Sequence, residues 1–146
     1  LKKLNLHTAE ISYQSSIIAK IYKVRGILKV FQIKFSKKYK NCCIEGRDIA
    51  TNILPNSDIK FYFVCNLNTA SFRRYKELKK NNKKIKLKEV KKALRIRNNY
   101  DTKRRISPLQ KHRAAIEIDT GKLSKQAMLK KMSKYVDKFI KTKYVN

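Results

Sequence analysis

Apolar residues recur along the chain with two different spacings. Over residues 1–35 they recur every three or four positions, which places them on one stripe of a helix. The stripe consists of Ile17, Ile18, Ile21, Val24, Leu28, Phe31 and Phe35. Thr8 is expected to cap this helix. Gly26 predicts a break near residues 22–26, because glycine costs about 1 kcal/mol inside a helix.

Short apolar runs predict three strands, at residues 41–45, 59–64 and 114–118. Such runs, bounded by Gly, Pro and polar residues, are typical of buried parallel strands. The segment 49–58 contains Pro55 and is expected to be a loop.

Helical spacing returns in three further segments. One predicted helix runs from an N-cap at Asn68 to Lys80, one carries Leu87 and Val90 and ends near Asn98, and the last follows a cap at Ser124. A polar turn is expected at 81–84 and a basic loop at 100–109. This order of elements predicts an α/β chain with a thin parallel sheet, like the later part of a doubly wound domain without its opening strand.

The large positive net charge says less about function than its magnitude suggests. The formal net charge is +28, which by itself favours nucleic-acid binding. The lysines are scattered over every segment, however, and the abundance of Lys, Asn and Ile also fits the codon bias of an A+T-rich genome. We therefore do not expect the charge to mark a nucleic-acid partner. No obligate protein partner is expected either.

Cysteine usage and hydropathy favour a cytoplasmic protein. Cys42, Cys43 and Cys65 all lie in strand-like runs, where reduced, buried thiols are expected. No apolar run reaches membrane-spanning length and no secretory signal pattern is visible in the printed sequence. The cysteines and the isolated His7 and His112 have no metal-ligand spacing, so no metal site is predicted.

Arginine is scarce, nine against twenty-nine lysines, so its placement is informative. Four arginines stand at predicted element ends or in loops, accompanied by two aspartates: Arg25, Arg47, Arg97 and Arg104, with Asp48 and Asp101. A guanidinium fork matches phosphate, and a carboxylate accepts from a ribose hydroxyl or an exocyclic base amine. The set therefore suits a nucleotide site. A group of ordinary surface arginines is the open alternative.

Several segments in order resemble bacterial cytidylate kinases: LHTAEISYQSS, KVRGIL, EGRDIAT, SFRRYKEL, RNNYDTKRRISPL and AIEIDTGKLS. The resemblance covers nearly the whole chain. It implies a P-loop α/β kinase that moves the γ-phosphoryl group of ATP to CMP or dCMP, with Mg²⁺. It also implies the following division: 1–16 as the end of the CMP-binding region, 17–72 and 105–146 as α/β core, and 73–104 as a lid.

The resemblance assigns five residues to substrate binding. Ser16 and Asp48 would contact the cytosine ring. Arg25 and Arg47 would hold the acceptor phosphate. Asp101 would hold the ribose.

Two arginines join the catalytic set by the same resemblance. Arg97 would bridge toward the transferred phosphoryl group, and Arg104 would assist at the cytosine side. Arg73 and Arg74 would begin the lid and reach the ATP side.

The sequence also departs from the family pattern. Ala50, Ala70 and Asn98 replace a usual Gly, Arg and Asp, and His7 replaces a common Arg. No G-x-x-x-x-G-K-[ST] loop occurs in the printed sequence, although such a loop cradles the ATP phosphates and orients Mg²⁺. The expectation is thus the C-terminal portion of a cytidylate kinase, without the first strand and P-loop, inactive and poorly stable alone.

Three alternatives remain open from the sequence. The chain could be a basic RNA-binding or ribosomal-type protein, which explains the charge but treats the Arg–Asp pattern as accident. It could be a UMP or AMP kinase relative. It could also be the product of a degraded gene that keeps the pattern without function.

Overall fold

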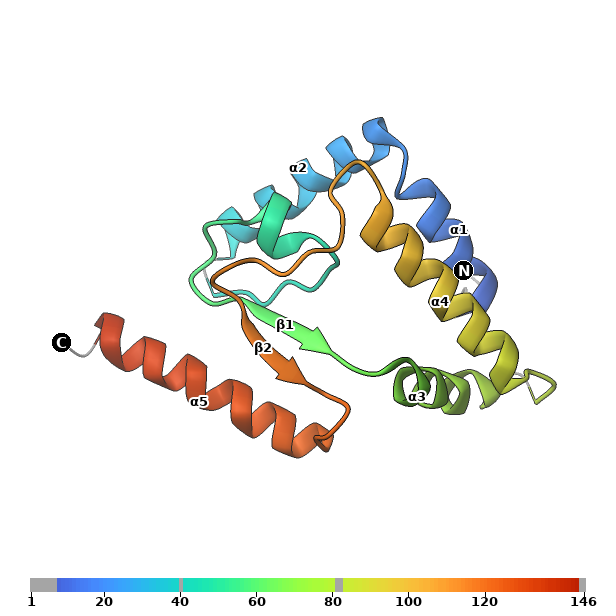
Figure 1. Cartoon of the computed structure of the whole chain (residues 1–146). Helices are drawn as coiled ribbons and strands as arrows, with labels where there is room; N and C mark the ends of the chain where they lie inside the picture. The colour runs from blue at the N-terminus through green and yellow to red at the C-terminus, as the bar shows by residue number, and fades with distance from the viewer. Residues whose placement is uncertain (1–7, 40, 81–82, 145–146) are drawn as a thin grey trace, which may run out of the picture.

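Helices dominate the architecture, and a short parallel sheet lies at its centre (Figure 1). The computed structural model describes residues 8–39, 41–80 and 83–144. Its elements in chain order are α1 (Ala9–Ile18), α2 (Tyr22–Lys38), a π-helical turn (Ile49–Ile53), β1 (Phe61–Val64), α3 (Leu67–Lys79), α4 (Leu87–Lys103), β2 (Ile116–Asp119) and α5 (Lys125–Tyr144).

The two strands pair in parallel, with Phe61 opposite Ile116 and Val64 opposite Asp119. The connection between them passes through α3 and α4, as a parallel pair requires a long crossover. Ile118 is fully buried at the centre of this sheet. The other buried apolar side chains of the described residues lie on the π-helical turn, α3 and α4: Ile49, Ile53, Leu78 and Val90. The core of the described chain is therefore small.

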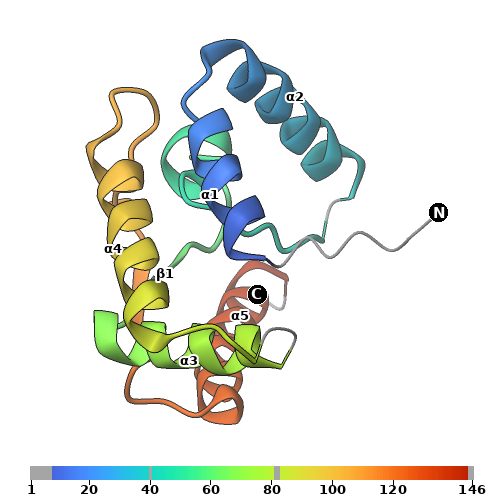
Figure 2. The same ribbon diagram turned by 90° about the vertical axis from the view of Figure 1, so that its right-hand side faces the viewer.

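The helices form two groups around the sheet. α4 packs against both α1 and α3, and the two views agree that α1 lies beside α4 (Figures 1 and 2). α2 contacts the π-helical turn. α5 follows β2 and runs along the side of the sheet away from α1, α2 and α4 (Figure 1). The predicted α/β class with a parallel sheet is confirmed at this level.

Local capping explains where several helices begin. The Thr8 hydroxyl accepts a hydrogen bond from the Ile11 amide at 3.1 Å, and the Ser124 hydroxyl accepts one from the Ala127 amide at 3.1 Å. Both caps were predicted, because Ser and Thr satisfy amides that a helix leaves free at its start. The cap of α3 is Asn66, whose side chain accepts from the Thr69 amide at 2.8 Å, so the predicted cap at Asn68 was wrong.

The break in the first long helix lies earlier than predicted. The chain leaves helical geometry at residues 19–21, and Gly26 lies inside α2. A Cβ at Gly26 would meet nothing within 4 Å, so this glycine marks no close approach. Arg25 donates to the Ala19 carbonyl at 3.4 Å and so satisfies a carbonyl at the end of α1. The predicted helical start at residues 1–7, including His7, lies outside the described residues.

The strand predicted at 41–45 was wrong. This stretch has no regular structure, and within the described residues the sheet contains only β1 and β2. Cys42 and Cys43 are exposed and only Cys65 is half-buried, so the expectation of three buried thiols was also wrong; all three are free. The run Cys-Cys-Ile is too short to bury much apolar surface.

Helix α4 continues to Lys103, well beyond the end predicted near Asn98. Its last turn carries Asp101, a buried carboxylate that ion pairs with arginines, and this tertiary contact stabilises a turn that the polar sequence alone does not favour. Residues 49–53, predicted as loop, form the π-helical turn. The predicted polar turn at 81–84 lies partly outside the described residues. In the described part of the chain no helix is long and apolar enough to cross a membrane.

Candidate nucleotide site

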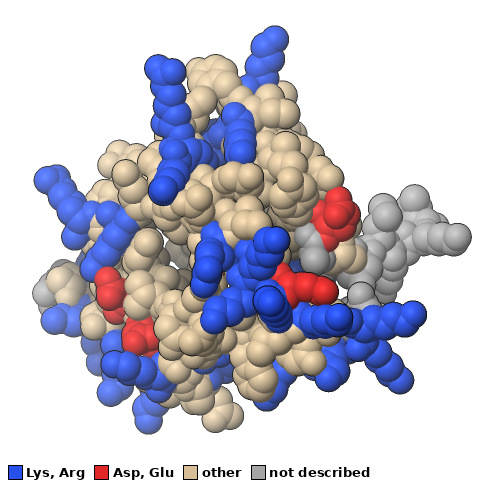
Figure 3. Space-filling view, turned by 45° about the vertical axis from the view of Figure 1, so that its right-hand side comes forward, with Lys and Arg blue, Asp and Glu red and all other residues tan. Residues whose placement is uncertain are grey.

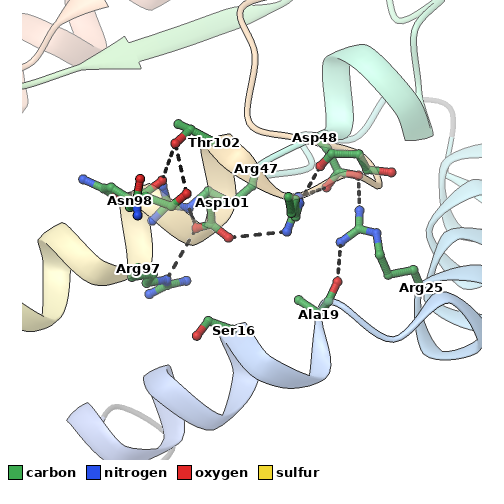
Figure 4. A network of polar contacts seen from close by, with 12 residues as sticks. Ser16, Ala19, Arg25, Arg47, Asp48, Arg97, Asn98, Asp101 and Thr102 are labelled. Atoms are coloured by element: carbon green, nitrogen blue, oxygen red, sulfur yellow. Dashed lines mark hydrogen bonds and ion pairs between the residues drawn. The ribbon is translucent and has the colours of Figure 1, made fainter.

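Asp48 lies just before the π-helical turn, and its side chain is buried. Its carboxylate pairs with the Arg25 guanidinium from α2 and lies 3.6 Å from Nη2 of Arg104 (Figure 4). Asn52, one turn later, donates from Nδ2 to the same carboxylate at 3.3 Å. Two guanidinium groups and one side-chain amide, from three chain segments, therefore surround this one acidic side chain.

Asp101, in the last turn of α4, is the second buried carboxylate of this region. Its oxygens lie 3.3 Å from Nε of Arg47, 3.4 Å from Nη1 of Arg104 and 3.8 Å from Nε of Arg97 (Figure 4). The Asp101 carbonyl accepts from the Leu109 amide at 2.7 Å, which fixes the loop that follows α4. Asp101 thus joins helix α4 to the loop before the π-helical turn.

Arg104 connects the two carboxylates, with one terminal nitrogen near each. Its Nε donates to the Ser107 carbonyl at 2.6 Å, and Asn52 donates to the Ser107 hydroxyl at 2.6 Å. Ser107 has φ 50°, a left-handed conformation that the surrounding bonds impose on a non-glycine residue. The fork of Arg104 is therefore oriented before any ligand arrives.

We use the name Arg–Asp cluster for Arg25, Arg47, Asp48, Arg97, Asp101 and Arg104. It holds four guanidinium groups against two carboxylates, so it is positively charged overall. Burial, the dominant effect, and the neighbouring Arg25 lower the pKa of Arg104, while both carboxylates act in the opposite direction. Burial also lowers the pKa of Arg47, against the attraction of Asp101. The excess positive charge lies in a partly dehydrated environment, which favours an anionic ligand.

Several donors of the cluster are still available. Nε of Arg25, Nε of Arg97 and Nη2 of Arg104 are buried, and they donate no hydrogen bond to any described residue. Arg97 is close enough to Asp101 for an ion pair but not for a hydrogen bond. Buried donors without acceptors are costly, and phosphate oxygens would satisfy them with charge-assisted hydrogen bonds.

A model of the cytidylate kinase family matches residues 2–138 of the chain. The chain belongs to the cytidylate kinase family. Among curated relatives, a cytidylate kinase from Clostridium tetani is 33% identical over 130 residues, 89% of this chain and 57% of the relative. One from Thermosipho melanesiensis is 34% identical over 131 residues, which are 90% of this chain and 60% of the relative. One from Bartonella bacilliformis is 36% identical over 140 residues, which are 96% of this chain and 64% of the relative. The chain spans about three fifths of the length of these relatives.

Membership of the cytidylate kinase family confirms the predicted resemblance, and the RNA-binding alternative is not favoured. The structure brings together the six residues of the Arg–Asp cluster from α2, the 47–48 loop and α4. Ser16 is buried on α1 and donates to the Tyr13 carbonyl at 2.7 Å, and Figure 4 shows it below Arg97 on the side of α1 that faces the cluster.

Arg73 and Arg74 lie on α3, outside the Arg–Asp cluster. Arg73 donates to the Thr120 carbonyl at 2.7 Å, just beyond β2. Arg74 pairs with Glu77 at 2.7 Å and contacts the Ser12 hydroxyl at 3.3 Å. Their expected role on the ATP side stays a prediction.

Sequence reasoning missed Asn52 and Ser107, which position Asp48 and Arg104. Asn52 follows Asp48 by four residues, and this spacing could have suggested the hydrogen bond between their side chains. No pattern in the neighbouring sequence indicates that Ser107 contacts Arg104 and Asn52. Asn98 replaces the usual Asp of the family pattern, and its Oδ1 accepts from Nη1 of Arg47 at 3.3 Å, so this side chain still orients one arginine of the cluster.

The described residues do not fit a magnesium ion. They contain no group of three or more potential metal ligands, and guanidinium groups surround both buried carboxylates of the cluster. No step is therefore assigned to a metal held by these residues.

Proposed function

We propose that the Arg–Asp cluster binds the acceptor nucleotide of a cytidylate kinase, which transfers the γ-phosphoryl group of ATP to CMP or dCMP and gives CDP or dCDP. The observation that carries this proposal is the pair of buried carboxylates among four arginines, three of which retain buried, unsatisfied donors. Such a site offers both parts that a nucleoside monophosphate needs: donors for phosphate and acceptors for the base and sugar.

The roles divide by chemistry. Asp48 accepts from the exocyclic amine of cytosine, with Ser16 beside the ring. Arg25 and Arg47 hold the acceptor phosphate, and Asp101 accepts from a ribose hydroxyl. UMP would present a carbonyl oxygen to Asp48 where CMP presents an amine, so the carboxylate disfavours it.

Phosphoryl transfer depends on positioning and on charge neutralisation more than on covalent help. Arg97 neutralises charge on the transferred group, and Arg104 supports the reaction by fixing both carboxylates. Arg73 and Arg74 act on the ATP side, with ATP and Mg²⁺ held mainly by a phosphate-binding loop. We also assign the sheet to a P-loop kinase fold, in which residues 73–104 move as a lid that excludes water.

Nucleotide titration of the purified chain tests this proposal. Calorimetric titration should show tighter binding of CMP than of AMP or UMP. Asp48→Ala should lower CMP affinity about ten- to hundredfold, the range for loss of a hydrogen bond to a charged group. Asp58→Ala is the matched control, because Asp58 is exposed and pairs only with Lys143 among the described residues.

Circular dichroism would verify that each variant keeps its helix content, and Asp48→Asn would separate the loss of charge from the loss of shape. Equal affinity for CMP and AMP, or unchanged CMP affinity in folded Asp48→Ala, would disprove a CMP site at Asp48. Salt-sensitive RNA binding without any mononucleotide preference would support the RNA-binding alternative instead.

A further inference from the structure

The two oxygens of the Asp48 carboxylate have different surroundings. Oδ2 pairs with the Arg25 guanidinium, which approaches from α2 (Figure 4), and accepts from Nδ2 of Asn52 at 3.3 Å. Oδ1 lies 3.6 Å from Nη2 of Arg104, which is too long for a hydrogen bond, and no described residue donates a hydrogen bond to it. The protein therefore occupies Oδ2, and Oδ1 is the oxygen that stays available to a ligand.

Asn52 holds this arrangement through contacts at both ends of its side-chain amide. Its Nδ2 donates to Oδ2 of Asp48 and, at 2.6 Å, to the Ser107 hydroxyl. Its Oδ1 accepts from Nζ of Lys29 at 3.3 Å. The reverse orientation of the amide would turn its oxygen toward the carboxylate and its donors toward an ammonium group, so both contacts would become repulsive. Lys29 thus sets which end of the Asn52 amide faces Asp48.

Lys29 is turned toward the protein, unlike the many Lys and Arg side chains that project from the face in Figure 3. It is half-buried and lies four residues after Arg25, so the two cations reach the π-helical turn from the same side of α2. Arg25 contacts Asp48 directly, and Lys29 contacts it through Asn52. Two successive turns of α2 therefore fix the same carboxylate.

Ser107 brings the loop after α4 into the same network. Its hydroxyl accepts from Asn52, and its carbonyl accepts from Nε of Arg104. Its φ of 50° is a conformation that glycine adopts with less strain than serine. The backbone alone would thus favour glycine at this position, and the serine hydroxyl supplies the contact with Asn52.

We propose that Asn52 is a positioning residue that determines the base specificity of Asp48, and that Lys29 and Ser107 fix its amide. Asn52 and Arg25 together keep the carboxylate from turning, so Oδ1 presents its lone pairs at one place. A base with an amine at that place, such as cytosine, donates to Oδ1, whereas uracil presents a carbonyl oxygen there and is rejected. The inference rests on the proposed function, which assigns Asp48 to the base, and adds residues that act without touching the nucleotide.

The ratio of CMP affinity to UMP affinity, measured by calorimetric titration of the purified 146-residue chain, tests this inference. Asn52→Leu keeps a side chain of similar size and removes both ends of the amide. It should lower the ratio at least about tenfold, the factor expected for a lost hydrogen bond to a charged group. CMP affinity should fall and UMP affinity should not, because UMP gains nothing from the position of Oδ1.

Thr51→Val is the matched control for Asn52→Leu. Thr51 lies in the same π-helical turn and is also half-buried, but its hydroxyl donates to the Asp48 backbone carbonyl, at 3.4 Å, and not to the carboxylate. Its replacement removes a polar group from the same turn without releasing Oδ2. The ratio of CMP to UMP affinity should therefore stay unchanged in Thr51→Val.

Two further variants test how the amide is fixed. Lys29→Met should lower the ratio about threefold, the factor for loss of one ordinary hydrogen bond. Lys34→Met should leave it unchanged, because Lys34 is an exposed lysine of the same helix. Ser107→Gly removes the hydroxyl and suits the local φ, so it should lower the ratio without straining the backbone.

The outcomes separate this inference from the proposed function. An unchanged ratio in Asn52→Leu that keeps its helix content by circular dichroism would overturn the inference and leave the CMP site standing. Equal losses of CMP and UMP affinity would also overturn it, because a purely structural role of Asn52 would weaken both nucleotides alike. If Asn52→Leu does not fold, Lys29→Met and Ser107→Gly decide by the same criterion. Absence of CMP binding by the unaltered chain would overturn the proposed function and this inference together.

Discussion

Arg104→Lys is expected to lower the free energy of unfolding by about 2 to 4 kcal/mol, the range for losing a charged hydrogen bond and part of a buried ion-pair network. Arg104 reaches Asp48, Asp101 and the Ser107 carbonyl with three different nitrogens. A single ammonium group keeps the charge but cannot occupy these three positions together. Urea denaturation followed by circular dichroism would measure the loss.

The neighbouring Arg105→Lys is the matched control. Arg105 is exposed, so the same replacement should change stability by less than about 0.5 kcal/mol. Arg104→Lys should also weaken CMP binding, since both carboxylates lose their common support. Equal stability losses for the two variants would mean that the fork geometry of Arg104 contributes nothing, and the central position assigned to it would be incorrect.

A polypeptide of the printed 146 residues is expected to transfer no phosphoryl group from ATP to CMP at a measurable rate. The printed sequence contains no G-x-x-x-x-G-K-[ST] loop, and the described residues offer no magnesium site. The β- and γ-phosphates would then lack their backbone donors. Charge stabilisation at the transferred phosphoryl group is worth about 10³-fold or more in phosphoryl transfer.

A coupled assay for CDP would measure this rate, with the full-length Clostridium tetani relative assayed in parallel as the active reference. CDP formation that scales with the chain and disappears in Arg97→Met would contradict the expectation. It would show that the Arg–Asp cluster and neighbouring lysines can orient ATP without such a loop. CMP binding by the chain is a separate matter, because the residues proposed to contact CMP all lie in the described part of the chain.

The sequence predicts best those features that depend on contacts between residues close together along the chain. Thr8 and Ser124 cap their helices as expected, because the hydroxyl and the amide it binds are three residues apart. The arginines and aspartates that the sequence singled out also lie together in the structure, whereas their roles in binding and catalysis stay predictions. Their residue types and order along the chain carried the signal, even though they come from separate elements.

Long-range contacts account for most of what was missed. The last turn of α4 forms because Asp101 is held by Arg47 and Arg104, which a reading of residues 98–103 alone does not reveal. Residues 41–45 look like a strand but have no pairing edge among the described residues. Asn52 meets Ser107 only because the loop after α4 returns to the π-helical turn.

The pairing of Phe61 with Ile116 has a consequence for the kinetics of folding. The two strands meet only after the whole α3–α4 segment has been closed into a loop, and loop closure of this length slows the formation of contacts. Contacts between α3 and α4 need no such closure. We therefore expect amides of α3 and α4 to become protected before those of β1 and β2 in pulse-labelled refolding, and simultaneous protection would refute this order. The sheet would then form after the α3–α4 pair that connects its two strands.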